Sequence, residues 1–74
     1  MVHPITLKTK EDVLRLNNLA TKENFNLKVS TGSIIIDAKS LLALFALIGK
    51  KVNLVASDRT DPETFSNFIK KITK

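Results

Sequence analysis

Short segments with alternating or β-branched apolar residues predict four β-strands in this 74-residue chain. Residues 2–8 and 51–57 alternate apolar and polar side chains, as expected for strands with one buried face. Residues 25–30 alternate in the same way, and the β-branched run 33–37 follows after a break at Gly32. The last two segments are therefore predicted to form a hairpin.

Two segments have apolar residues at helical spacing. The first begins at Thr9, whose hydroxyl can accept a hydrogen bond from the free amides of a first turn. The other begins at Asp61, which precedes a proline whose φ angle already suits a helix. The predicted buried stripes are Val13, Leu16 and Ala20 in the first helix and Phe65, Phe68, Ile69 and Ile72 in the other.

Residues 40–48 are apolar on every face, and their length would suit a strand or a short helix. Leucine and alanine favour a helix. Ser40 resembles an N-cap and Gly49 a C-terminal stop. We therefore predict a short helix here.

The predicted element order is βαββαβα. Because helices must bury their apolar stripes against another layer, we predict an α+β fold. In this fold a four-stranded, mostly antiparallel sheet carries three helices on one face. Residues 1–74 are about half the usual length of a domain, so they are interpreted as one domain.

The composition narrows the possible functions. The chain has no cysteine, which excludes disulfides, thiolate catalysis and zinc sites built from cysteine. Its carboxylates mostly occupy predicted caps and turns, and its two glycines are isolated, so neither a hydrolase pair nor a phosphate-binding loop is indicated. We expect a protein that is not an enzyme and holds no cofactor or metal ion.

The longest apolar run, residues 41–48, is far shorter than the roughly 20 residues of a membrane span, and the first residues do not form a secretory signal.

Residues 33–47, which read SIIIDAKSLLALFAL, resemble the HPr family, the histidine-containing phosphocarriers of the bacterial sugar phosphotransferase system. In that family a strand ends in a Lys-Ser pair that opens a short second helix, and Lys39 and Ser40 match that junction. The resemblance covers nearly the whole chain in element order. It implies an HPr-like open-faced β-sandwich and a bacterial protein of the cytoplasm.

The chain departs from the family at the site that carries the phosphoryl group. The family holds that group on a histidine in a His-x-Arg-Pro-type motif between the first strand and the first helix, whereas residues 7–12 here read LKTKED. Neither the nucleophile nor a phosphate-binding arginine is present at this junction. The one histidine, His3, lies at the other end of the strand. Phosphocarrier activity is therefore not expected.

Ser40 matches the serine that a dedicated kinase phosphorylates in some bacterial members of the family, so the resemblance implies a phosphorylation site. A phosphate at a helix N-terminus is favoured by the helix dipole and the unpaired amides. The alternative is that Ser40 is only an N-cap, which would stabilise the helix by roughly 1 kcal/mol.

A helix packed on a sheet buries one stripe of side chains, so the apolar segment after Ser40 cannot be covered completely. Some apolar surface should be exposed and should favour an interaction site. The alternatives are homodimer packing or burial under the chain termini. If Leu44, Leu47 and Ile48 point inward, then Leu41, Leu42 and Phe45 point outward, and these three match the family positions that dock partner proteins.

The net charge of +5 admits an acidic protein, a nucleic acid or an anionic surface as partner. A basic phosphate- or nucleic-acid-binding domain is therefore the alternative function, with lysines 50, 51, 70 and 71 as its candidate patch. Nucleic-acid binding is disfavoured because stacking needs free aromatic rings, and two of the four phenylalanines lie on a core stripe. We expect a regulatory or adaptor protein that binds a protein partner and is a monomer or weak homodimer.

Overall fold

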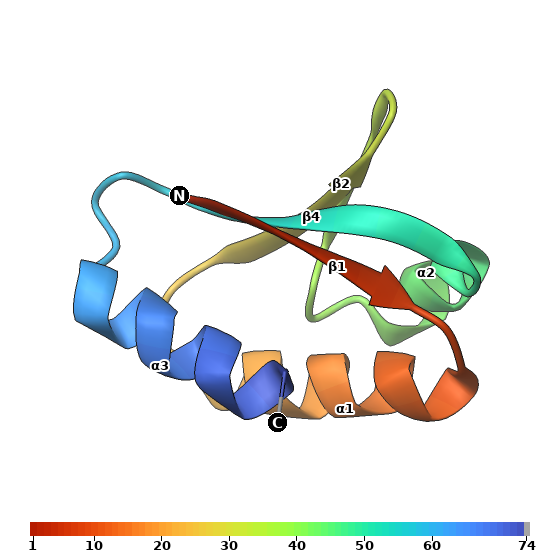
Figure 1. Ribbon diagram of the computed structural model, residues 1–74, viewed down its shortest axis with the longest axis horizontal. Helices are drawn as coiled ribbons and strands as arrows, with labels where there is room; N and C mark the ends of the chain where they lie inside the picture. The colour runs from red at the N-terminus through yellow and green to blue at the C-terminus, as the bar shows by residue number, and fades with distance from the viewer. Residues whose placement is uncertain (74) are drawn as a thin grey trace.

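The computed structural model describes residues 1–73, which form an antiparallel sheet with helices packed on one face (Figure 1). The strands are β1 (Val2–Leu7), β2 (Leu27–Thr31), β3 (Ile34–Asp37) and β4 (Lys50–Ala56), in the spatial order β1-β4-β2-β3. The helices are α1 (Lys10–Thr21), α2 (Leu41–Leu44) and α3 (Pro62–Ile72), and a 3₁₀ turn, η1 (Phe45–Leu47), follows α2. The α+β class and the order βαββαβα are therefore confirmed.

The core lies between the sheet and the helices α1 and α3, which run side by side beneath it (Figure 1). Alternate side chains of the strands point into this layer because successive residues of a strand face opposite sides. Burying a large apolar side chain contributes about 1.5–3 kcal/mol, so this layer carries most of the stability. Of the predicted helix stripes, Val13, Leu16, Ala20, Phe65 and Phe68 are buried, whereas Ile69 and Ile72 are only half-buried. In the last strand, the alternate residues Val52, Leu54 and Ala56 are buried.

Only Lys8 and Thr9 connect β1 to α1, and a reciprocal pair of hydrogen bonds fixes the start of the helix. The Thr9 hydroxyl accepts a bond from the Asp12 amide at 3.2 Å, and the Asp12 carboxylate accepts one from the Thr9 amide at 3.2 Å. The same carboxylate accepts a bond from the Lys8 amide at 2.9 Å. This capping box satisfies donors that the first helical turn leaves free.

α3 begins as predicted, because the Asp61 carboxylate accepts a hydrogen bond from the Thr64 amide at 2.9 Å and Pro62 occupies the first turn.

The strand predicted at residues 25–30 starts later than expected, since β2 begins at Leu27. Phe25 is instead half-buried, and its ring packs edge-on against Phe68 with 5.9 Å between centroids. An aromatic contact between Phe25 and α3 therefore takes the place of the first strand residues that were predicted here.

The segment 40–48 is not one α-helix. Four residues form α2, η1 tightens the chain into a 3₁₀ turn, and Ile48 is already extended with φ −60° and ψ 131°. Gly49 then takes a φ of +88° and its amide donates to the Leu7 carbonyl, which aligns the chain with the start of β4. Ile48, predicted to point inward, is consequently 38% exposed.

The hairpin of β2 and β3 extends beyond the helices at the tip of the sheet (Figure 1). Thr31 and Ile34 pair across a loop of Gly32 and Ser33, and Gly32 has a φ of +55°. Positive φ at the first loop residue is typical of a type II′ turn, whose twist suits a two-residue hairpin. No helix within residues 1–73 is both long and apolar enough to cross a bilayer.

Candidate partner-binding surface

Ser40 is exposed and lies directly before α2. Its amide donates to the Asp37 carbonyl at 2.9 Å, and its carbonyl accepts from the Leu44 amide at 3.1 Å. Its hydroxyl makes no capping hydrogen bond to a residue of the described chain. The hydroxyl therefore does not stabilise the helix in the way that the N-cap alternative requires, although the backbone of Ser40 occupies the cap position.

Asp37, the last residue of β3, fixes the turn that carries Ser40. Its carboxylate accepts a hydrogen bond from the Lys39 amide at 2.9 Å and lies 3.6 Å from the Lys28 ammonium on β2. The hydrogen bond from the Lys39 amide lowers the pKa of Asp37, and the positive charge of Lys28 acts in the same direction. Lys39 also donates from its ammonium to the Glu23 carbonyl at 3.5 Å.

The apolar side chains of α2 and η1 divide into buried, half-buried and exposed residues. Leu44 and Leu47 are buried, as predicted. Leu42 is 86% exposed, whereas Leu41 and Phe45 are half-buried and pack against the core. We call the surface formed by Leu41, Leu42 and Phe45 the α2 surface. Of these three residues, which were all predicted to point outward, only Leu42 does so fully, because the side chains of Leu41 and Phe45 pack against the core.

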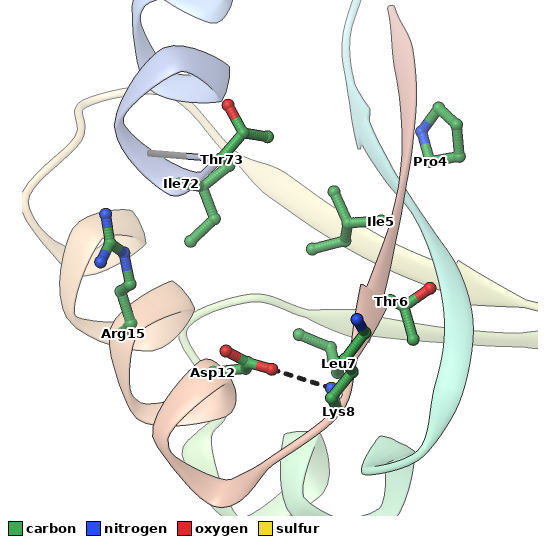
Figure 2. Close-up of a pocket in the computed structure, with 9 residues that line it drawn as sticks. All are labelled: Pro4, Ile5, Thr6, Leu7, Lys8, Asp12, Arg15, Ile72 and Thr73. Atoms are coloured by element: carbon green, nitrogen blue, oxygen red, sulfur yellow. Dashed lines mark hydrogen bonds between the residues drawn. The ribbon is translucent and has the colours of Figure 1, made fainter.

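The junction between β1 and α1 contains a groove of about 390 Å³ (Figure 2). Ile5 and Ile72 point into it from β1 and the last turn of α3, while Lys8, Asp12 and Arg15 line its polar side (Figure 2). Asp12 belongs to the capping box described above, and the Arg15 guanidinium donates to the Lys71 carbonyl at the end of α3. Asp12 therefore caps the start of α1 at this groove, and Arg15 joins α1 to the end of α3.

Two polar residues of α1 bond to segments far along the chain. Arg15 bonds to α3, as described, and the Asn17 side chain donates to the Ala38 carbonyl at 3.2 Å. Both bonds join residues far apart in the sequence, so helical spacing alone gave no signal for them. The Asn17 bond places the β3–α2 turn against the middle of α1.

His3 lies in β1 opposite Leu54 and is half-buried. It is separated from the start of α1 by the rest of the strand. The junction between β1 and α1 instead presents the side chains of Lys8, Thr9 and Asp12.

The four lysines of the candidate basic patch come from two elements. Lys50 and Lys51 begin β4, and Lys70 and Lys71 lie in the last turn of α3. Lys71 also forms an ion pair with Glu23 at 3.6 Å. The four phenylalanines are buried or half-buried, so none offers a free ring for base stacking.

No family model matches the sequence, and neither does any curated protein. The structure is similar to the crystal structure of HPr-C-His from Thermoanaerobacter tengcongensis, with a TM-score of 0.72. The alignment covers 100% of this chain and 97% of that chain at 19% sequence identity. The fold is HPr-like. This confirms the fold that the resemblance implied.

The two residues at the cap positions of α1 and α2 should respond differently to removal of their hydroxyls. We expect Thr9→Ala to lower the free energy of unfolding by about 1 kcal/mol, because it removes a capping hydrogen bond. Ser40→Ala should change it by less than about 0.5 kcal/mol, since an exposed hydroxyl without a capping bond is lost. Urea denaturation of both variants measures the difference, and equal losses would contradict the assigned geometry.

Asp37 should contribute to stability in a pH-dependent way. Its pKa in the folded state is lowered below its ordinary value of 3.8, so its contribution is present at neutral pH and is lost as the pH falls through the folded-state pKa. We expect Asp37→Asn to reduce stability at pH 7 by less than about 1 kcal/mol, because the ion pair is exposed. This difference from the wild type should shrink toward zero in acid, as measured by urea denaturation between pH 7 and pH 2. A difference that stays constant would show that the charge of Asp37 plays no part.

Proposed function

We propose that this HPr-like chain is a non-catalytic regulatory or adaptor protein, related to the phosphotransferase system, that docks a protein partner through the α2 surface. The observation that carries the proposal is the 86% exposure of Leu42 in the middle of a helix whose Leu44 is buried. Exposed apolar residues grouped on one surface mark interaction sites more often than other surface does.

The half-buried neighbours make Leu42 a suitable anchor. Leu41 and Phe45 pack against the core, so they hold the helix in place and offer part of their surface beside Leu42. An anchor that is already ordered loses little conformational entropy on binding. Transfer of the Leu42 side chain from water into a partner would contribute about 1.5–3 kcal/mol.

The β1–α1 junction supports a role without phosphoryl transfer. A phosphocarrier needs a nucleophilic imidazole with donors beside it for the phosphoryl oxygens. Here the amides of Lys8 and Thr9 donate to the Asp12 carboxylate, so a negative charge already occupies the position next to them. A second anion at this place would be repelled by that carboxylate.

Leu42→Asp is the sharpest test of docking, because Leu42 is exposed while Phe45→Asp would also disturb the core. The wild-type chain, immobilised, should capture a protein from a lysate of its own organism, and that protein should then bind Leu42→Asp at least about tenfold more weakly in calorimetry. Val2→Asp is the matched control, since Val2 is exposed at the opposite end of the sheet from α2 (Figure 1).

Equal capture by the wild type and Leu42→Asp would contradict docking through the α2 surface. If the bound material also dissociates steeply as salt increases, the basic phosphate- or nucleic-acid-binding alternative gains support, because such binding depends on counterion release. Apolar docking should depend little on salt.

We further infer that Ser40 is a phosphorylation site of this surface. Its hydroxyl is exposed, so modification would break no capping bond, and Lys39 next to it can face the added charge. Incubation with an HPr serine kinase and ATP should add one phosphate to the wild type and none to Ser40→Ala, as read by mass spectrometry. An unmodified wild-type chain in the same assay would contradict the assignment.

A further inference from the structure

The two edge strands of the sheet, β1 and β3, are protected to very different degrees. The terminal nitrogen and the carbonyl of Met1, just before β1, are both hydrogen-bonded to Ala56 of β4. Such hydrogen-bonded pairs occur at every second residue of an antiparallel strand, so the nitrogen of Pro4 faces away from β4. A proline there removes an outward donor from the exposed edge, which is one of the ways in which proteins prevent further strand pairing.

β3 lacks such protection. Residues 33–37 contain no proline and no lysine, and their one charged residue, Asp37, is paired with Lys28 at 3.6 Å. Ile34 and Ile35 are 48% and 71% exposed, on opposite faces of the strand. Within residues 1–73 no strand pairs with the outer side of β3. Although β3 has only 4 residues, its apolar and nearly neutral edge leaves unpaired backbone groups that are a template for another strand.

The pairing with β2 determines which backbone groups of β3 are free. The Ala38 amide donates to the Leu27 carbonyl at 2.9 Å, so hydrogen-bonded pairs recur at every second residue from there to the hairpin loop. Ile35 and Asp37 occupy the alternate positions, and their backbone groups point outward. The Asp37 carbonyl accepts from Ser40, which leaves the amide and the carbonyl of Ile35 as the central free pair.

We propose that two copies of this chain pair their β3 strands antiparallel about a two-fold axis through Ile35, which joins the two sheets into one. In this register the amide of each Ile35 donates to the carbonyl of Ile35 in the other copy, and the Asp37 amides extend the ladder at both ends. Ile34 of each copy then lies opposite Ile36 of the other. Since Ile36 packs against the core, this contact extends each core across the interface.

A second copy fits this edge better than an unrelated acidic partner. The register is self-complementary, because it pairs isoleucine with isoleucine on both faces of the strand, and Asp37 already has its cation. The strand has only 4 residues, so the interface should stay below the roughly 1,200 Å² of stable complexes and the dimer should be weak. Because each copy carries +5, salt should strengthen the pairing, whereas it would weaken binding of an acidic partner.

Sedimentation equilibrium of the purified chain tests the proposal. The average mass should rise from 8.2 kDa toward twice that value as the concentration increases to about 1 mM, and should rise further with added salt. Ile35→Lys should stay monomeric throughout, while Val2→Lys on the protected edge, at 62% exposure, should behave like the wild type. A wild type that stays monomeric, or that dimerises equally with Ile35→Lys, would overturn the proposal.

The register has a separate test, which needs no loss of association. Because the chain has no cysteine, Ile35→Cys introduces a single thiol. At a hydrogen-bonded pair the two Cα atoms are about 5.5 Å apart, which suits a disulfide. Under mild oxidation Ile35→Cys should form covalent dimers at least about tenfold faster than Ile34→Cys or Val2→Cys, whose thiols do not face their own equivalents. Equal rates for the three variants would exclude this arrangement. Neither experiment depends on the α2 surface.

Discussion

The structure depends on one constraint: a small sheet has a single covered face, and only one stripe of each helix can be buried against it. α1 and α3 satisfy this constraint, since each contributes buried residues at helical spacing and leaves its polar side in water. The apolar residues between β2 and β4 exceed what the layer can cover. Leu42 and Ile35 therefore remain outside, one on α2 and one on β3. Both surfaces proposed for interaction are made of this uncovered remainder.

Hydrophobic period was a reliable guide wherever an element is long enough to show it. The buried stripe of α3 and the inward residues of β4 could be predicted because each repeats its pattern over several turns or rungs. The hairpin was predicted from β-branched residues around Gly32, whose positive φ the two-residue loop requires. These signals depend only on residues that are close together in the sequence, so they can be recognised without the structure.

The remaining features are determined by contacts between distant segments. Phe25 leaves its strand pattern for Phe68, which lies far along the chain. After η1, the Gly49 amide donates to the Leu7 carbonyl, which lies far back along the chain. Ser40 has the residue type of an N-cap, but the bond from its amide to Asp37 fixes a backbone geometry in which its hydroxyl does not cap. At the candidate site, therefore, the residue type correctly predicted that Ser40 lies at the N-cap position, but it did not predict that its hydroxyl makes no capping hydrogen bond.

The two proposed surfaces are joined by a short and well-fixed connection. Only residues 38–40 separate β3 from α2, and within them Ala38 is buried and its carbonyl is bonded to Asn17. Because the turn is held in this way, a symmetric pairing through β3 would present two α2 surfaces in a fixed relation. A partner with two matching sites would then bind more tightly than either contact alone allows, since the second contact forms within the same complex. Weak self-association could in this way control docking without any change in the α2 surface itself.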